Sequence, residues 1–396
     1  SKSISNRVLV INALCDDAIP AEHLSDCDDT RVMLQAFAEG RNIVDIHGAG
    51  TAMRFLTAFY AQKQGHECTI TGTERMKQRP IKILVDALRS LGAEIRYLEK
   101  EGYPPLHILG RKLSGGALSL PGNVSSQYIS ALLMIAPYMR DGLNLSLTGE
   151  PVSVPYIEMT LGIMAHFGVQ ANRDGNSIQV PAGQYRPAPF RVEPDWSAAS
   201  YWYEIAALAT NAKIKLPGLS VKSLQGDARL AQLFEPIGVS THVTPDGIEL
   251  SKSGHTAFSI YECDLTEQPD LAQTLVVTCC LSEIPFRFTG LQTLRIKETD
   301  RIAALCDELA KLGYKLSASD NTLEWRGDTV EPQPHPVITT YDDHRMAMAF
   351  APAAFCFPGI TIRDIAVVDK SYPHYWDDLR KAGFSLSAQP KGGTTP

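Results

Sequence analysis

The sequence predicts an α/β fold of the α+β type that is built from a repeated unit. An amphipathic helical stretch, a glycine and an apolar strand-like stretch recur in this order around Gly92, Gly168, Gly238, Gly313 and Gly383. These glycines lie 76, 70, 75 and 70 residues apart, and near-constant spacing indicates a structural repeat. With 396 residues, the chain has room for two or three domains.

Local patterns predict the elements of each unit. The helical stretches, such as LVDALRSLG and LCDELAKLG, end in a glycine, which is the preferred residue just after a helix. The apolar segments between them, such as CTITG, LHILG, SIQVP and FRFTG, are short, rich in Val, Ile and Leu, and bounded by Gly, Pro or Asp. These properties predict the strands of mixed sheets.

The beginning and the middle of the chain modify this pattern. A sixth copy is expected to end near Gly40, but only 52 residues separate Gly40 from Gly92, so strands are expected to be missing from a shortened first repeat. The six units form two groups of three, and PAPFRVEPDWSAASYW is the expected crossover, close to Asp195. We therefore expect domains at residues 1–194 and 195–396, and a disordered tail in QPKGGTTP.

The composition argues against several classes of function. Hydrophobic residues make up 44% and charged residues 20% of the chain, as in a soluble globular enzyme, and the net charge of −7 argues against a nucleic-acid-binding protein. No run of 18 apolar residues predicts a membrane span. The eight cysteines lack zinc-type spacing and are expected to be reduced thiols of a cytoplasmic protein. Without a dinucleotide or P-loop motif, we expect no cofactor and no metal.

The segment LQTLRIKETDR, residues 291–301, concentrates charge where a strand-like run is expected to become a helix. It places the cations Arg295, Lys297 and Arg301 beside the carboxylates Glu298 and Asp300. A helix start offers unpaired N–H groups and a positive dipole end, so an anion can bind there. A solvated helix start is an equally good interpretation of this segment alone.

Polar clusters recur at predicted helix starts in both halves of the chain. They are Lys2, Ser3 and Arg7; Gly48, Gly50, Thr51 and Arg54; Arg75, Lys77 and Arg79 before Pro80 as a first helical residue; Ser125, Ser126 and Gln127; Ser153 and Tyr156; Asp270 after Pro269; Asp342, Asp343, His344 and Arg345; and Lys370 at a strand end. Taken singly, most can be interpreted as an N-cap, a tight turn or solvated charge. One anionic ligand site that faces both domains is the simplest common explanation.

Seven segments, in this order, closely resemble the 5-enolpyruvylshikimate-3-phosphate (EPSP) synthase family, the 3-phosphoshikimate 1-carboxyvinyltransferases. They are SKSISNR, GAGTAMR, RMKQRPI, SSQYISALL, VPYIEMT, LRIKETDR and DDHRMAMAFA. The resemblance implies the two-domain enolpyruvyl transferase fold, an inside-out α/β barrel with three βαβαββ repeats in each domain. It also implies a reaction in which the enolpyruvyl group of phosphoenolpyruvate moves to the 5-hydroxyl of shikimate 3-phosphate and phosphate is released, in a cleft of a monomer.

The resemblance further implies roles for individual residues. Contacts to shikimate 3-phosphate fall on Ser3, Arg7, Ser125, Ser126, Gln127, Ser153, Tyr156, Asp270 and Lys297, mainly in the N-terminal domain. Contacts to phosphoenolpyruvate fall on Lys2, Gly50, Arg79, Gln127, Arg301, Arg345 and Lys370. Substrates with about five negative charges between them need cations in this number, and arginine suits carboxylate and phosphate.

The implied chemistry is an addition and elimination through a tetrahedral intermediate. Asp270 is the implied base for the 5-hydroxyl and Glu298 the implied acid for the methylene carbon, with Lys2 able to share in proton transfer and His344 near the leaving phosphate. A dry site raises the pKa of Glu298, whereas Lys297 and Arg301 lower it. Closure of the two halves is expected to exclude water.

Two positions depart from the family pattern, and two alternative functions remain. Gly48 and Thr293 stand where the family usually has asparagine, which loosens polar detail without removing a charge. A related enolpyruvyl transferase acts on UDP-N-acetylglucosamine, but the reactive cysteine loop typical of that family is not found here. A non-catalytic anion-binding module on the same fold predicts the loss of Asp270 or Glu298, and both are present.

Overall fold

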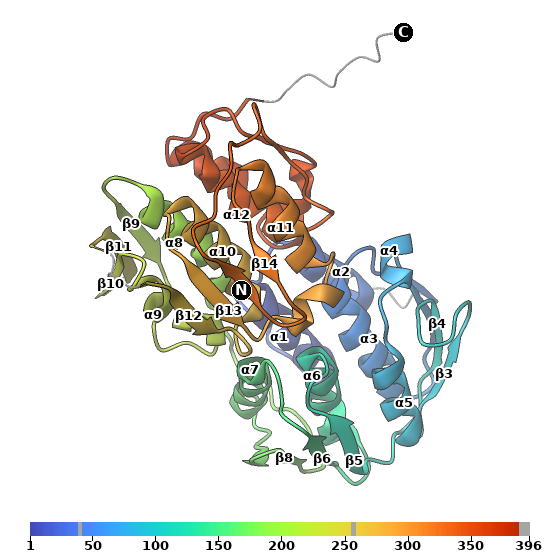
Figure 1. The fold of residues 1–396 in the computed structure, drawn as a ribbon. Coiled ribbons are helices and arrows are strands. Elements are labelled where there is room, and N and C mark those ends of the chain that lie inside the picture. Colours follow the sequence, from blue (N-terminus) through green and yellow to red (C-terminus); the bar gives the residue numbers. More distant parts are fainter. Residues whose placement is uncertain (39–41, 255–258, 388–396) are drawn as a thin grey trace.

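The chain forms two groups of helices and sheets, each with its own hydrophobic core (Figure 1). The structure, a computed structural model, describes residues 1–38, 42–254 and 259–387. Buried apolar side chains form one cluster within residues 4–192 and a second within residues 196–379. The mixed α/β content is therefore as the sequence predicts.

The first group contains the elements up to residue 180. Its helices are α1 (Lys2–Leu14), α2 (Asp28–Ala38), α3 (Gly50–Gln62), α4 (Glu74–Lys77), α5 (Lys82–Ser90), α6 (Ser126–Ile135) and α7 (Val154–His166), with the 3₁₀ helix η1 (Ala136–Tyr138). Its strands are β1 (Ile43–Asp45), β2 (Glu67–Thr71), β3 (Glu94–Tyr97), β4 (Leu106–Leu109), β5 (Gly116–Pro121), β6 (Leu143–Thr148), β7 (Asn172–Asp174) and β8 (Ser177–Val180).

The second group contains the remaining elements. Its helices are α8 (Trp196–Leu208), α9 (Leu230–Phe234), α10 (Ala272–Leu281), α11 (Arg301–Lys311), α12 (His344–Phe350) and α13 (Tyr375–Lys381), with the 3₁₀ helices η2 (Gly226–Arg229), η3 (Pro269–Leu271), η4 (Gln292–Ile296), η5 (Ala351–Phe355) and η6 (Ile365–Lys370). Its strands are β9 (Lys213–Pro217), β10 (Val239–Thr244), β11 (Gly247–Lys252), β12 (Tyr261–Asp264), β13 (Phe286–Thr289), β14 (Ser317–Ala318), β15 (Leu323–Trp325), β16 (Val337–Ile338) and β17 (Thr361–Ile362).

Three sheets share one topology, which confirms the repeat. Their strand orders are β1-β2-β4-β3, β5-β6-β8-β7 and β12-β13-β15-β14. In each sheet the first two strands are parallel and joined through a helix, and the other pairs are antiparallel. The chain order is therefore βαβαββ in all three. Two smaller sheets contain only part of this four-stranded arrangement. The sheet β10-β11-β9 has its antiparallel pairs, and β16-β17 has its parallel pair.

The glycines that revealed the repeat adopt the left-handed conformation. Gly92, Gly168, Gly238, Gly313 and Gly383 have φ values of 102°, 86°, 96°, 93° and 100°. The helices α5, α7, α11 and α13 end two residues before such a glycine, and glycine is favoured there because it has no Cβ to clash. After Gly383, the described residues 384–387 contain no strand. Gly40 and the predicted tail lie outside the described residues.

Among the described residues, the first repeat shows no antiparallel hairpin. Elsewhere, as after α5, the chain forms an antiparallel hairpin such as β3-β4 before the next unit begins. Helix α2 ends at Ala38 and β1 begins at Ile43, so only four residues separate these two elements. Within the described residues 1–38, β pairing is limited to a single bridge between Glu22 and Arg191.

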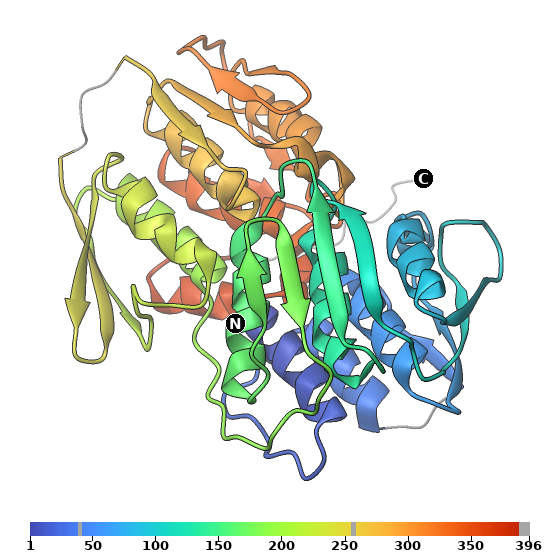
Figure 2. The same cartoon turned by 90° about the horizontal axis from the view of Figure 1, so that it is seen from below.

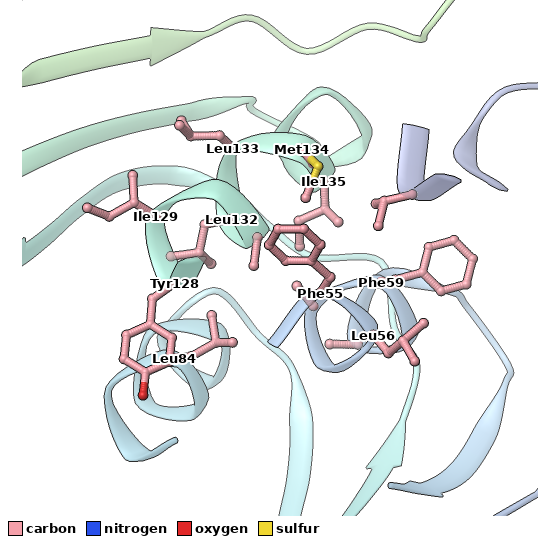
Figure 3. Close-up of a cluster of buried hydrophobic side chains, with 14 of the residues drawn as sticks. Phe55, Leu56, Phe59, Leu84, Tyr128, Ile129, Leu132, Leu133, Met134 and Ile135 are labelled. Carbon is pink, nitrogen blue, oxygen red and sulfur yellow. The ribbon is translucent and has the colours of Figure 1, made fainter. Parts of the chain in front are cut away.

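The helices lie inside each group and the sheets lie outside (Figures 1 and 2). Every residue of α3 is buried, as is every residue of α10 and α12. Phe55 of α3 lies near Leu132 and Ile135 of α6, and Leu84 of α5 lies near Tyr128 of α6 (Figure 3). A helix that is buried all round is largely apolar on every face, although Thr57 of α3 and Thr278 of α10 are buried polar residues in mid-helix. Among the described residues, no helix has the length and apolar character needed to cross a membrane.

The predicted crossover connects β8 to α8. Asp195 caps α8 by accepting a hydrogen bond from the Ala198 N–H at 3.0 Å. Its other carboxylate oxygen accepts a hydrogen bond from the backbone N–H of Lys2 at 3.1 Å. The start of α1 is therefore attached to the first residue after the crossover, which places Lys2 beside the second group.

Candidate functional site

A cavity of about 340 Å³ lies where the two groups meet. It is lined by every predicted site residue except Lys370, namely Lys2, Ser3, Arg7, Gly50, Arg79, Ser125, Ser126, Gln127, Ser153, Tyr156, Asp270, Lys297, Glu298, Arg301, His344 and Arg345. Lys370 joins the site indirectly, because its Nζ donates to Glu298 Oε1 at 2.8 Å. The structure thus brings together segments that are up to about 340 residues apart in the sequence.

Helix starts converge on this cavity from both groups. The first residue or the N-cap of α1, α3, α6, α7, η3, α11 and α12 lines it. The first N–H groups of a helix have no partner within the helix, and the helix dipole makes that end positive. Many helix starts around one cavity therefore favour a ligand with several negative charges.

Arg301, the first residue of α11, is the centre of the polar network. Its side chain is only 2% exposed. Nε donates to Asp343 at 2.7 Å, Nη1 to Asp270 at 3.1 Å and Nη2 to Glu298 at 3.0 Å. Burial lowers the pKa of Arg301, but the three carboxylates raise it overall. Because the guanidinium is planar and rigid, it holds the predicted base and the predicted acid in a defined relative position.

Asp270, in η3, has a carboxylate surrounded by cations. Oδ1 lies 3.4 Å from Lys297 Nζ, and Oδ2 lies 3.1 Å from Arg345 Nη2. The Tyr156 hydroxyl also donates to Oδ2, at 3.4 Å across the cavity. Burial would raise the pKa of Asp270, but Arg345, Lys297 and Arg301 hold it well below its usual range. Asp270 is therefore ionised, as a proton acceptor must be.

Glu298 lies in the turn between η4 and α11. Its Oε1 is bonded to Lys370 and lies 3.8 Å from Arg79 Nη1, while Oε2 accepts from Arg301. Burial would raise the pKa of Glu298, but Lys370, Arg301 and Arg79 hold it well below its usual range. The sequence predicted two opposing effects on the pKa of Glu298, burial and neighbouring cations, and the effect of the cations is the larger. The cations responsible include two that lie outside the 291–301 segment.

The SKSISNR segment forms the first two turns of α1. Arg7 is buried and donates to Thr160 Oγ1 at 2.7 Å and to Ser130 Oγ at 3.2 Å. Burial lowers the pKa of Arg7 to about 10, so it remains a cation at neutral pH. Burial also lowers the pKa of Lys2, but Asp29, 3.5 Å away, contributes to a net rise.

Two arginines pack against the start of α3 because Gly50 has no side chain. A Cβ at Gly50 would lie 2.5 Å from Arg79 Nη1 and 2.6 Å from Arg54 Nη1. Arg54 donates to the Gly50 carbonyl at 2.7 Å, and its buried Nε has no hydrogen-bond partner among the described residues. Burial and the nearby Arg79 lower the pKa of Arg54 to about 10.

The serine segments form helix starts, as their structural interpretation predicts. Ser125 caps α6 by accepting from the Gln127 N–H at 3.4 Å, while Gln127 Nε2 donates to Thr51 Oγ1 at 3.2 Å. Ser153, the residue before α7, has a left-handed φ of 56°, which is a strained conformation for serine. Its N–H donates to the carbonyl of Thr266 in the second group at 3.2 Å. The start of α7 is therefore held against the opposite wall.

The DDHR segment places three buried polar residues at the start of α12. Asp343 accepts from the Arg345 N–H at 2.9 Å and also binds Arg301. Arg345 Nη1 donates to the Asp270 carbonyl at 3.0 Å. Neither ring nitrogen of His344 has a hydrogen-bond partner among the described residues. Burial, Lys2 and Arg345 hold the pKa of His344 well below its usual range, so a neutral imidazole lines the cavity.

Some predicted local structures are wrong. Residues 292–296 form the 3₁₀ helix η4 instead of a strand-like run, because Leu291 and Leu294 are both buried at the three-residue spacing of such a helix. Pro80 is not a first helical residue, since α5 begins at Lys82. Lys77 pairs with Glu74 and Glu99 of the first group, and it does not face the anionic ligand that the sequence predicted for it.

Other expectations for neighbouring residues are confirmed. Asp300 caps α11 and pairs with Arg295 at 3.0 Å, so these two charges of the 291–301 segment have a structural role. All eight cysteines are free thiols, and five of them are buried.

The sequence left several cavity residues without an assigned role. They include Asp29, Thr51, Arg54, Lys82, Asn123 and Thr293. Arg54 carried a detectable signal, because it lies four residues after Gly50 and therefore on the same face of a helix. Asp29 carried none, since it reaches the site by pairing with Lys2 in another helix.

Comparison with known proteins identifies the family. A model of EPSP synthase (3-phosphoshikimate 1-carboxyvinyltransferase) matches residues 36–379. The chain belongs to the EPSP synthase family. A 3-phosphoshikimate 1-carboxyvinyltransferase of Bacteroides fragilis is 58% identical over 389 residues, which cover 98% of this chain and 94% of that protein. One from Photobacterium profundum is 38% identical over 411 residues, covering 96% and 94%.

Solved structures support the fold of this EPSP synthase family member. An EPSP synthase from Acinetobacter baumannii matches with a TM-score of 0.76 and 22% identity, covering 97% of this chain and 94% of that chain. The enolpyruvyl transferase fold implied by the seven segments is therefore confirmed.

Proposed function

We propose that this chain transfers the enolpyruvyl group of phosphoenolpyruvate to the 5-hydroxyl of shikimate 3-phosphate, with release of phosphate. This reaction belongs to aromatic amino-acid biosynthesis. Membership of the EPSP synthase family supports the proposal. The single observation that carries it is the charge of the cavity, where eight cations face three carboxylates. The cations are Lys2, Arg7, Arg54, Arg79, Lys82, Lys297, Arg301 and Arg345, and the carboxylates are Asp29, Asp270 and Glu298.

The excess of five positive charges matches the two substrates. They carry two phosphates and two carboxylates, which amount to about five negative charges at neutral pH. The whole chain has a net charge of −7, so this local excess is opposite to the average charge of the protein. Bringing two anions together becomes favourable because the cations neutralise both in a partly dry cavity.

The substrates divide between two sets of residues in this proposal. Shikimate 3-phosphate contacts Ser3, Arg7, Ser125, Ser126, Gln127, Ser153, Tyr156, Asp270 and Lys297, and phosphoenolpyruvate contacts Lys2, Gly50, Arg79, Gln127, Arg301, Arg345 and Lys370. The position of the residues around the cavity supports this division, because the first set lies mainly on α1, α6 and α7 of the first group. We propose residues 1–194 and 195–396 as the two domains, supported by the separate hydrophobic cores.

In the addition step, Asp270 removes the proton of the 5-hydroxyl while the oxygen attacks C2 of phosphoenolpyruvate. Its low pKa and its three cationic neighbours support an ionised carboxylate that accepts a proton. Lys297 and Arg345 also orient this carboxylate, because each contacts a different oxygen. A fixed base next to the hydroxyl lowers the barrier by positioning as well as by proton transfer.

Glu298 supplies the proton for the methylene carbon in the same step. Its pKa is low because Lys370, Arg301 and Arg79 surround it. When the carboxylate and phosphate of phosphoenolpyruvate bind these cations, their field at Glu298 weakens and burial raises its pKa. In the elimination step Glu298 takes a proton back from the methyl group, the C2–O bond to phosphate breaks, and His344 donates a hydrogen bond to the departing phosphate.

The chain is proposed to act as a monomer, because the cavity is built from its own residues. The related transferase acting on UDP-N-acetylglucosamine is the second candidate. Among the residues that the structure describes, no cysteine lines the cavity, so the thiol typical of that family has no counterpart here. A non-catalytic anion-binding module is also disfavoured, because Asp270 and Glu298 both face the cavity.

A phosphate-release assay with three reaction mixtures tests the proposal. The purified chain receives phosphoenolpyruvate with shikimate 3-phosphate, with UDP-N-acetylglucosamine, or alone. We expect phosphate release only with shikimate 3-phosphate, and mass spectrometry of the product should show the added enolpyruvyl group. No turnover from a protein that unfolds cooperatively would contradict the proposal, and turnover with the sugar nucleotide alone would establish the second candidate.

A further inference from the structure

Arg75 contacts the main chain of Glu298 from the opposite wall. Its Nε donates to the Glu298 carbonyl oxygen at 3.0 Å, between residues 223 positions apart. Arg75 lies on α4 in the first group, whereas Glu298 belongs to the second. This hydrogen bond forms only while the two groups are in contact. Arg75 does not line the cavity among the described residues, so its contact is with the protein and not with a substrate.

The first group anchors α4 firmly. Thr73 caps the helix by accepting from the Met76 N–H at 3.3 Å, and the Thr73 N–H donates to the His47 carbonyl at 3.1 Å. Met76 is buried in the first core. The main chain of Arg75 is therefore held in place, and the hydrogen bond of its exposed side chain links that position to Glu298.

Among the described residues, the Glu298 carbonyl accepts no main-chain hydrogen bond. Helix η4 ends at Ile296 and α11 begins at Arg301, so Glu298 lies between regular elements. A charged donor forms a stronger hydrogen bond than a neutral one, so Arg75 contributes substantially to fixing this turn.

We propose that Arg75 is a positioning residue that fixes the Glu298 main chain when the two groups meet, and so places its carboxyl group for proton transfer. Arg79, four residues further on, lies 3.8 Å from the carboxylate of the same residue. One segment of the first group therefore holds both the main chain and the side chain of Glu298. The inference rests on the proposed function, because it takes Glu298 as the acid.

Three variants test this role by steady-state kinetics. Arg75→Ala is expected to lower kcat about tenfold, with the KM of both substrates nearly unchanged, because a misplaced acid slows the chemistry without weakening binding. Arg75→Lys should recover part of kcat, since an ammonium group can still donate to the carbonyl. Lys77→Ala is the matched control on the same helix, because Lys77 pairs only with Glu74 and Glu99 among the described residues, and it should leave kcat unchanged.

Hydrogen exchange gives a readout that does not depend on activity. Arg75→Ala should speed amide exchange in residues 297–300, and Lys77→Ala should not. If the wild-type chain shows no turnover, the proposed function fails, and unchanged exchange at 297–300 in Arg75→Ala would then overturn the contact itself. In an active enzyme, an unchanged kcat in Arg75→Ala, or a loss confined to KM, would overturn the positioning role.

Discussion

Replacing Gly50 with alanine tests the cavity wall with a single methyl group. Gly50 is the first residue of α3, and its φ lies outside the left-handed region, so alanine fits the backbone there. Alanine also has a higher helix propensity than glycine. The substitution should therefore leave the fold intact, and its effect should come from the space that the methyl group occupies.

The geometry sets the size of the effect. The methyl carbon would lie 2.5 Å from Arg79 Nη1 and 2.6 Å from Arg54 Nη1, whereas ordinary contacts begin at 3.4 Å. Both guanidiniums must therefore move by roughly 1 Å, because an overpacked site cannot absorb the extra volume. A displaced guanidinium loses a hydrogen bond to phosphoenolpyruvate that contributes about 1.5–3 kcal/mol, which corresponds to a KM for phosphoenolpyruvate that is roughly 10 to 150 times higher. The KM for shikimate 3-phosphate should change little.

The assay measures phosphate release while phosphoenolpyruvate is varied at saturating shikimate 3-phosphate. Gly48→Ala is the matched control in the same turn, because a Cβ at Gly48 meets nothing within 4 Å. We expect Gly48→Ala to keep the wild-type KM. An unchanged KM for phosphoenolpyruvate in Gly50→Ala would refute the reasoning, as would an equal rise in the control.

Two further changes test the chemistry and the electrostatics. Glu298→Gln should lower kcat by about 10²- to 10⁴-fold while shikimate 3-phosphate binding, measured by calorimetry, stays the same; an equal loss of both would contradict its role as the acid. Burial raises the pKa of Asp227, in η2, to about 6. Between pH 4 and 6 the native state therefore keeps a proton that the unfolded state has released. The free energy of unfolding falls as the pH rises through this range. Asp227→Asn should therefore raise the free energy of unfolding at pH 8 by up to about 3 kcal/mol more than at pH 4. Urea unfolding at the two pH values measures this difference. Equal changes at both would show that the pKa of Asp227 is not raised in the native state.

Much of the fold could be predicted because its signals are local. Glycine after a helix and serine before one act within a few residues, so Gly92, Gly313 and Ser125 indicated helix ends correctly. The predicted start of α5 at Pro80 was wrong, because proline is only preferred, and not required, at the first position of a helix. The 3₁₀ helix η4 was missed because its shape follows the burial of Leu291 and Leu294, which the sequence alone does not show.

The members of the candidate site could also be found from the sequence, because seven ordered segments carry the family resemblance. The sequence by itself determined the repeat, the charged helix starts and most of the charged residues that meet in the cavity, although not Asp29 or Lys82. Only the tertiary structure decided which charges meet. Glu298 is held by Lys370 and Arg79, and its main chain by Arg75, from segments about 70 to 220 residues away. A pKa depends on charges within a few ångströms, and those distances are set by the packing of the two groups.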